Sequence, residues 1–325
     1  MNLREFALVA AYIASHVAMD IVGAGAPATA AVDVAFLIGF LYALMDDVEK
    51  EVSALGIHGI YNVMLVSWVA AIPQTVVAIY FAKAGLYTAA FLDSMVSTLI
   101  DAFIVTALVR IQYLDAFRRD WHLILLWIAA TLAFGATVAA PLNLGLETEP
   151  YYAGWLLIGA IGLPLLFARG IAGRPAVSAP TAVNLAVNTI LVIYTAWNLG
   201  QDLTTWHATE SQLGALAAVV ATLPDLITAL LIRAVLGRLT AEFAASEDAI
   251  RTMFAAAIHD QISDPALVLL IAPISALYFP HWLNIFISLL KLTLLDRRAF
   301  LLAGLPAAAA TTAALMLGKA VFIPT

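Results

Sequence analysis

Two short stretches that lie far apart in the chain share one pattern: AIPQTVVA at residues 71–78 and TLPDLITA at residues 222–229. In each stretch a proline and then a polar residue interrupt an apolar segment that is long enough to cross a bilayer. A second apolar segment follows each stretch and carries an acid, at Asp101 in DAFIV and at Asp264 in DPALV. A pattern that occurs twice in the same order predicts an internal duplication.

The composition places the chain in a membrane. Hydrophobic residues make up 63% of the 325 residues and charged residues 11%, whereas soluble domains contain about 25% charged residues. The mean hydropathy is +0.97. We therefore expect an all-α integral protein of the cell membrane whose main partner is the lipid bilayer. The net charge of −7 comes from dispersed residues, so we expect no nucleic-acid partner, and the absence of cysteine excludes disulfides and thiolate metal sites.

The apolar runs predict about 11 transmembrane helices. Residues 1–26 would form an extra N-terminal helix, residues 27–172 a first five-helix repeat and residues 173–325 a second five-helix repeat. The expected spans are, in order, 3–24, 31–48, 57–82, 87–110, 121–140, 151–169, 180–200, 211–237, 250–276, 279–295 and 299–321. The first of them also resembles a secretory signal peptide, but His16 and Asp20 interrupt its apolar part, so we expect a retained helix.

The positions of the basic residues predict the orientation. If the N-terminus is cytoplasmic, all of the 15 Lys and Arg residues except Lys83 and Lys319 fall at cytoplasmic ends of the predicted spans. This distribution follows the positive-inside rule. Because each repeat has an odd number of spans, the second repeat would enter the membrane from the opposite side. The result is an inverted repeat, which provides a structural basis for alternating access.

The prolines of the two repeated stretches lie well inside their predicted spans, each with a polar residue directly after it. Pro73 and Pro224 both lack a backbone N–H, and each ring clashes with the carbonyl four residues earlier. We therefore expect both helices to be broken and to release backbone oxygens, which in lipid must face protein, water or a cation. Gln74 and Asp225 would add side-chain oxygens at the same two places.

The segment after each proline-containing helix carries acids on one helix face. Asp93, Ser97 and Asp101 are spaced i, i+4 and i+8, and Asp260 and Asp264 are spaced i and i+4. A carboxylate at the centre of a bilayer costs about 3 kcal/mol or more, and an oxygen-lined cage of this kind suits hard cations such as Ca²⁺. The alternative is that the acids are protonated and bonded to neighbouring helices, which applies most to Asp93 because it has no counterpart in the second repeat.

These motifs resemble those of the cation/calcium exchanger superfamily, of the sodium/calcium exchanger type. That family carries Gly-Thr-Ser-x-Pro-Glu on one helix of each inverted repeat and Gly-Ser-Asn-Ile-x-Asn/Asp on the next helix. Here residues 69–74 (VAAIPQ) and 220–225 (VATLPD) stand at the first motif, and residues 96–101 (VSTLID) and 259–264 (HDQISD) at the second. The resemblance covers nearly the whole chain after residue 30 and is that of a divergent member.

Carried over residue by residue, the resemblance implies a set of cation ligands. The side chains that it places around the cation are Gln74, Ser97, Asp101, Asp225, Asp260 and Asp264. It implies backbone or secondary contributions from Ser67, Asp93, Ala218 and Thr222. The charged ligands of a divalent metal ion would be Asp101, Asp225 and Asp264.

The function that the resemblance implies is secondary active antiport. The chain would move Ca²⁺ or a similar divalent cation in exchange for Na⁺ or H⁺, with these ions as its small partners, no cofactor and no enzymatic activity. Gln74 stands where the family has glutamate. Ala70 and Ala71, and in the second repeat Ala221 and Thr222, stand where relatives have the Thr-Ser hydroxyls that help to bind sodium. Protons taken up by Asp225 or Asp264 are therefore an alternative coupling ion.

Two other functions stay open on the sequence. A membrane-embedded metal hydrolase would use His259, Asp260 and Asp264, with His58 as a further ligand, although no His-Glu-x-x-His pattern accompanies them. A non-transporting scaffold derived from an exchanger would explain the missing hydroxyls. The sequence indicates no oligomeric state.

Overall fold

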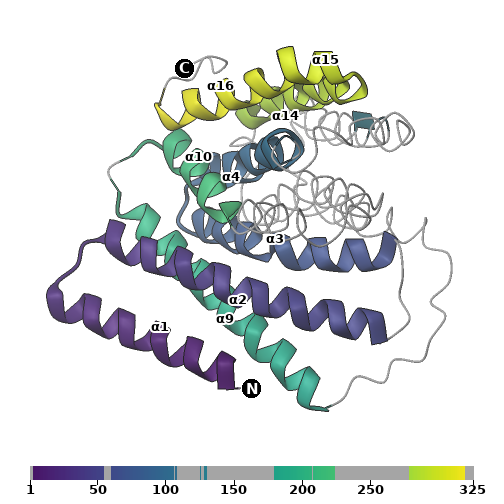
Figure 1. Cartoon of the computed structure of the whole chain (residues 1–325). Coiled ribbons are helices and arrows are strands. Elements are labelled where there is room, and N and C mark those ends of the chain that lie inside the picture. Colours follow the sequence, from purple (N-terminus) through teal and green to yellow (C-terminus); the bar gives the residue numbers. More distant parts are fainter. Residues whose placement is uncertain are drawn as a thin grey trace, which may run out of the picture.

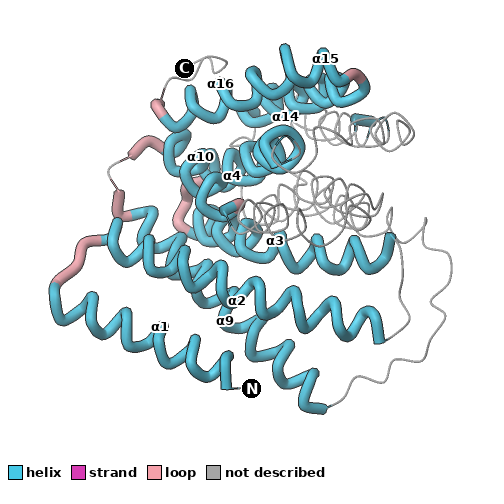
Figure 2. The backbone as a smooth tube through the Cα atoms, in the orientation of Figure 1, coloured by secondary structure: helices cyan, strands magenta, loops and turns pink. Residues whose placement is uncertain are grey.

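The computed structural model describes residues 3–54, 60–105, 107, 125, 128–129, 179–206, 208–223 and 278–318. Within these ranges the chain is helical, and short turns join the helices (Figure 2). Four of the described helices are long and apolar enough to cross a membrane, namely Ala26–Met45, Tyr87–Ile104, Ala182–Thr204 and Arg297–Met316. The structure thus agrees with an all-α membrane protein. Of the predicted domain layout, residues 55–59 and much of 106–178 and 224–277 lie outside the description.

The chain begins with a helical hairpin (Figure 1). Helix α1 spans Leu3–Val22 and α2 spans Ala26–Ala54. Gly23 ends α1 with a φ of 63°, which an L side chain rarely adopts. Its N–H donates to the carbonyl of Asp20 at 3.2 Å, and the N–H of Ala24 donates to that of Met19 at 2.9 Å. These two bonds form a Schellman motif, which satisfies the last carbonyls of α1 and reverses the chain.

Helix α9, at Ala179–Thr204, packs against α2 in the opposite direction (Figure 1). Near the end of α2, Asp47 accepts a hydrogen bond of 2.9 Å from Asn188, which lies near the start of α9. Near the start of α2, Asp33 is linked through Tyr12 to Asn198 in the later part of α9. The two helices therefore run antiparallel along most of their length.

Helix α3 runs from Ile60 to Lys83 and is joined to α4, Tyr87–Leu99, by a turn at Gly85, whose φ is 79°. Pro73 lies inside α3, which continues through it, so the expected break of this helix is wrong. Helices α2, α3 and α9 share one apolar cluster, to which α3 contributes the fully buried Val77 and Phe81. This packing stabilises α3 on the C-terminal side of Pro73. In a helix bundle, neighbouring groups can compensate for the one hydrogen bond that a proline removes.

Helix α10, at Glu210–Ala221, lies directly against α4. A Cβ added at Gly214 would lie 2.6 Å from the carbonyl oxygen of Ala89 and 2.7 Å from the Cβ of Leu92. Only glycine permits the two backbones to come this close. At the beginning of both helices, the carboxylate of Glu210 accepts a 3.0 Å hydrogen bond from the backbone N–H of Thr88. The two helices therefore run side by side from the same level.

The C-terminal helices cover α4 on its other side (Figure 1). They comprise α14 at Tyr278–Leu290, the 3-10 helix η4 at Lys291–Leu295, the short α15 at Arg297–Ala299, the π-helix η5 at Phe300–Gly304 and α16 at Leu305–Met316. A second apolar cluster joins them to α4 and α10. Lys291, which the sequence places at the end of a predicted span, lies directly after α14 and is fully buried among these helices.

A pair of glycine substitutions tests the close approach of α10 to α4. Gly214→Ala places a methyl group against the Ala89 carbonyl and is expected to cost about 1–3 kcal/mol of stability. Gly39→Ala is the matched control, because a Cβ there meets only Leu8, at an ordinary 3.5 Å, and alanine favours a helix by about 1 kcal/mol over glycine. Thermal unfolding in detergent should show a lower midpoint for Gly214→Ala only. Equal midpoints for the two variants would contradict this packing.

Candidate functional site

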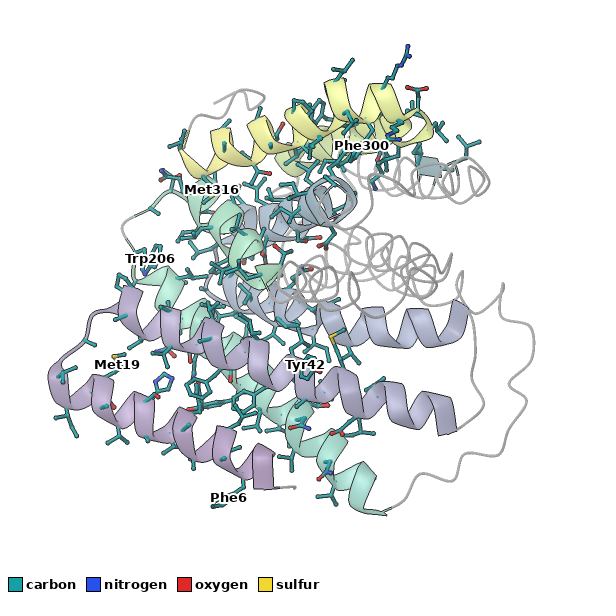
Figure 3. All side chains as sticks on the ribbon, viewed as in Figure 1. Phe6, Met19, Tyr42, Trp206, Phe300 and Met316 are labelled. Atoms are coloured by element: carbon teal, nitrogen blue, oxygen red, sulfur yellow. The ribbon has the colours of Figure 1, made fainter. Side chains whose placement is uncertain are left out.

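The most enclosed helix of the described part is also rich in polar residues. Of the candidate span Tyr87–Ile104, 83% of the residues are buried, compared with 33%, 28% and 33% of the other three candidate spans. Helices α3, α10 and α14 all contact it (Figure 3). Its fully or nearly fully buried polar residues are Asp93, Ser94, Ser97, Thr98 and Asp101. Because a lipid-facing helix would carry apolar groups instead, this arrangement marks α4 as the centre of the candidate site.

Two hydroxyl groups of α4 bond back to their own helix. Ser97 Oγ donates to the carbonyl oxygen of Ser94 at 2.8 Å, and Thr98 Oγ1 donates to the same oxygen at 3.0 Å. A hydroxyl that donates its one proton in this way keeps its oxygen lone pairs. Ser97, a predicted ligand, can therefore offer an oxygen to a cation without breaking its bond to the helix. Ser94 and Thr98 are buried beside it, although the motifs did not single them out.

Asp101 lies on an irregular turn of the same segment. Directly after Leu99, the α-helix gives way to a π-helix, η1, at Ile100–Val105. π-Helical turns are rare and frequently occur at functional sites, because the extra residue in the turn redirects side chains and loosens the backbone hydrogen bonds. Asp101 is 7% exposed. The turn thus gives Asp101 a position that an undistorted helix would not provide.

Gln74 is a buried amide on α3, the helix that packs against α4. It follows Pro73 directly, its side chain is 1% exposed, and its Oε1 has no hydrogen-bond partner among the described residues. An unsatisfied buried acceptor costs about 1–3 kcal/mol. An amide oxygen is a good ligand for Ca²⁺ and similar hard cations, so a cation bound beside Gln74 would offset that cost.

Helix α10 ends where the second proline motif begins. The α-helix stops at Ala221, and Thr222, fully buried, is its C-cap, as expected for a helix that a following proline disrupts. The Thr222 Oγ1 donates to the carbonyls of Ala218 at 2.7 Å and Val219 at 3.1 Å, and its N–H donates to Ala218 at 3.0 Å. The Ala218 carbonyl thus has two donors here. Its role as a cation ligand stays a prediction.

The two irregular turns lie at similar depth in the bundle. Glu210 and Thr88 are in contact at the start of α10 and α4. Thr222, where α10 ends, lies 12 residues after Glu210 (222 − 210), and Ile100, where the π-helix begins, lies 12 residues after Thr88 (100 − 88). With α3 in contact with both helices, the elements that carry Gln74, Asp101 and Thr222 meet in one part of the molecule.

The rest of the predicted ligand set is only partly within the described residues. Ser67 lies in α3, before Pro73, and Asp93 is fully buried on α4. Asp225, Asp260 and Asp264 lie outside the described residues, as do His58 and His259 of the hydrolase alternative. The ligand roles of these residues and of Asp101 stay predictions. Among the residues that are described, no three His, Cys, Asp or Glu side chains are grouped as a metal site.

Comparisons with known proteins find similar folds among solved structures and no match at the level of sequence. No family model and no curated protein matches the sequence. Among solved structures, the H⁺/Ca²⁺ exchanger CAX is similar with a TM-score of 0.63 and 12% identity, over 97% of this chain and 93% of that one. The structure of native YfkE is similar with a TM-score of 0.60 and 14% identity, over 97% and 98%.

These likenesses establish the fold over nearly the entire chain. The expected resemblance to the cation/calcium exchangers is thus confirmed at the level of the fold. The identities of 12% and 14% carry no residue roles. What the site does rests on the residues of this chain.

The substitution Gln74→Leu separates a ligand from a structural residue. Replacing an unpaired buried amide by an apolar group of similar volume should leave stability unchanged or raise it slightly. If the Gln74 Oε1 binds a cation, the same variant should bind Ca²⁺ at least about 10-fold more weakly, or about 1.4 kcal/mol. Isothermal titration calorimetry in detergent measures the Ca²⁺ affinity of the wild type and of the Gln74→Leu variant. A Gln74→Leu protein that binds Ca²⁺ as tightly as the wild type would remove Gln74 from the site.

Proposed function

We propose that this chain is a secondary active antiporter of the cation/calcium exchanger superfamily that moves Ca²⁺ or a similar divalent cation across a membrane. The observation that carries the proposal is the concentration of buried oxygen groups on α4, the most enclosed candidate span of the described part. The fold, shared with an H⁺/Ca²⁺ exchanger, supports it. The full arrangement would be two inverted five-helix repeats plus α1, with a cytoplasmic N-terminus.

The described residues can replace part of the hydration shell of a cation. Ca²⁺ takes six to eight oxygen ligands in flexible geometry. Asp101 supplies charge, Gln74 an unpaired amide oxygen, and Ser97 a hydroxyl oxygen whose proton is already donated. Asp225, Asp260 and Asp264 would complete the shell from the second repeat. Neutralising the carboxylates also removes the cost of burying them, so the site and its cation stabilise each other.

The exchange cycle follows from the requirement that buried charge be neutralised. Once the divalent cation leaves, the carboxylates must bind another positive charge before the helices can return to the conformation that is open to the other side of the membrane. H⁺ is the coupling ion that we favour over Na⁺, because protons bind to the same carboxylates and need no extra ligands. Ala71 is buried beside Pro73 and offers no oxygen side chain, whereas a sodium site would require further oxygen ligands.

The motion would use the irregular turns. Helix α10 ends at Ala221 with Thr222 as its C-cap, and α4 passes into a π-helix at Ile100. Such turns lose few hydrogen bonds when they change shape, whereas the regular helices α2 and α9 can move only as rigid bodies. Alternating access would thus combine rigid movement of long helices with small adjustments around the cation.

Transport in liposomes tests the proposal. The purified protein is reconstituted with a Ca²⁺-sensitive dye inside the vesicles, and a pH gradient and a Na⁺ gradient are imposed separately. We expect the pH gradient to drive Ca²⁺ movement. Asp101→Asn should reduce the initial rate about 10-fold or more, since it removes a charged ligand while keeping the side-chain shape. Asp20→Asn, on the exposed face of α1, is the matched control and should keep the wild-type rate.

The outcomes of this experiment separate the possible functions. If only the Na⁺ gradient drives Ca²⁺ movement, the coupling ion is Na⁺ and not H⁺. If neither gradient moves Ca²⁺, Mn²⁺ or another divalent cation, the proposed antiport is wrong, and the scaffold alternative then gains support.

A further inference from the structure

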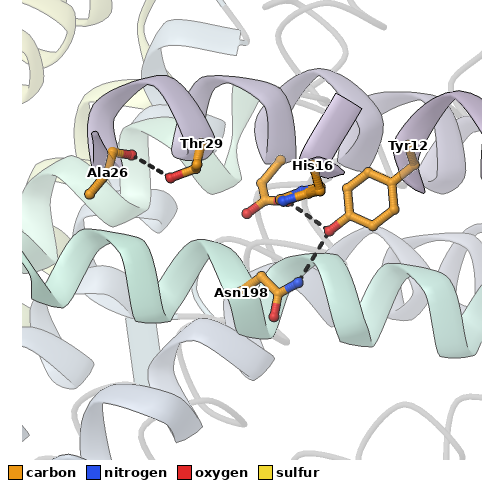
Figure 4. Close-up of polar contacts among 6 residues, drawn as sticks. Tyr12, His16, Ala26, Thr29 and Asn198 are labelled. Carbon is orange, nitrogen blue, oxygen red and sulfur yellow. Dashed lines mark hydrogen bonds and ion pairs between the residues drawn. The ribbon is translucent and has the colours of Figure 1, made fainter. Parts of the chain in front are cut away.

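A second polar cluster lies away from the candidate cation site, where α1 meets α2 and α9. Tyr12 Oη donates to Asp33 Oδ1 at 2.7 Å, and His16 Nε2 contacts the same oxygen at 2.9 Å. Asn198 Nδ2 donates to Tyr12 Oη at 3.2 Å. In Figure 4 the side chains of Tyr12, His16 and Asn198 converge from α1 and α9. Three helices are thus joined through one phenol and one carboxylate.

The carboxylate of Asp33 is buried without complete hydrogen bonding. Asp33 is 0% exposed, and its Oδ2 has no partner among the described residues, while its Oδ1 has two. A buried carboxylate requires a nearby positive charge or full hydrogen bonding. The titratable groups that face it are Tyr12 and His16 from α1 and Asp202 from α9. Of these only His16 can supply a positive charge.

Helix α1 depends on this cluster for its place in the bundle. Of the side chains described on α1, Tyr12 alone is buried. Its ring makes edge-on contacts with Phe36 at 5.2 Å and Phe40 at 5.7 Å. Much of the remaining surface of α1 is exposed and apolar, as at Phe6, which points away from the bundle (Figure 3). Between helices in lipid there is no hydrophobic driving force, so polar contacts and close packing decide whether they stay together.

We propose that Tyr12, His16 and Asp33 form a proton-binding site, separate from the cation site, that fastens α1 to the α2–α9 pair. The proton binds to His16 rather than to Asp33, because the His16 side chain is 29% exposed while that of Asp33 is 0% exposed. With Nε2–H bonded to Asp33 Oδ1, the incoming proton binds to Nδ1, no other bond breaks, and the ring becomes an imidazolium. The histidine and the carboxylate then form a pair with no net charge.

The direction of the pH effect follows from this charge balance. When His16 is neutral, Asp33 carries a buried charge that the surrounding apolar helices disfavour. When His16 is protonated, the ion pair forms only if α1 is docked, so acid favours the docked state and alkali weakens it. The attachment of α1 should therefore weaken as the pH rises.

The absence of cysteine from the chain makes a direct test possible. Phe6→Cys on α1 and Ile190→Cys on α9, at positions that are 58% and 63% exposed, would carry two spin labels. The distance between them is measured by pulsed electron paramagnetic resonance in nanodiscs from pH 5 to pH 9, without a Ca²⁺ gradient. We expect a narrow distribution in acid and a broader, longer one in alkali.

Substitutions in the labelled protein identify the group that titrates. His16→Gln keeps a hydrogen-bond donor but cannot gain a charge, so its distances should no longer change with pH. Asp33→Asn should also lose the change, and Asp20→Asn, on the exposed face of α1, should keep it. A labelled protein whose distances do not change with pH would overturn the proposal. So would a His16→Gln variant that keeps the same pH dependence. Neither result bears on Ca²⁺ transport.

Discussion

A bilayer offers no hydrogen-bonding partner to a polar group, and the rest of this structure follows from that constraint. The polar side chains of the chain must face other helices, and α4 collects them: Asp93, Ser97 and Asp101 are all buried on the span that the other helices surround. In a soluble protein the most enclosed helix would be the most apolar one. Here enclosure and polarity coincide, because the surrounding helices shield the polar groups from lipid.

Close contacts between backbones keep the enclosed helix in position. Gly214 lets α10 lie directly on α4, and the Glu210 carboxylate holds the start of α4 through Thr88. Beyond these rigid contacts both helices become irregular, α10 at Thr222 and α4 at Ile100. The α4–α10 pair is thus held by close contacts where both helices begin and is irregular near Thr222 and Ile100. The candidate ligand Asp101 lies in the irregular part. The antiport proposed for this chain needs both, since its site must be preserved while access to it changes.

Much of the fold could be predicted from the sequence because spans are long and their apolar runs are clear. The expected spans 3–24, 87–110 and 180–200 correspond closely to α1, to α4 with η1, and to α9. The uninterrupted course of α3 through Pro73 could not be predicted, since it depends on how Val77 and Phe81 pack against other helices. The π-helix at Ile100 could not be predicted either, because no local sequence pattern indicates it.

The site was predictable only as a set of residue types. The spacing of Asp93, Ser97 and Asp101 indicates one helix face, and all three are buried as that pattern suggests. The burial of Lys291 could not be foreseen, because its place near a span end is typical of a solvated residue. The cluster at Asp33 was missed as well, although an acid within the apolar run 31–48 was a visible signal.

The account depends on a cation that binds beside α4, between α3 and α10. Anomalous diffraction from crystals that contain Ba²⁺ in place of Ca²⁺ would locate it directly. The account predicts a strong peak within about 3 Å of an Asp101 carboxylate oxygen, on the side of α4 that faces Gln74 and Thr222. Ba²⁺ peaks confined to the surface of the protein, with none beside α4, would contradict it.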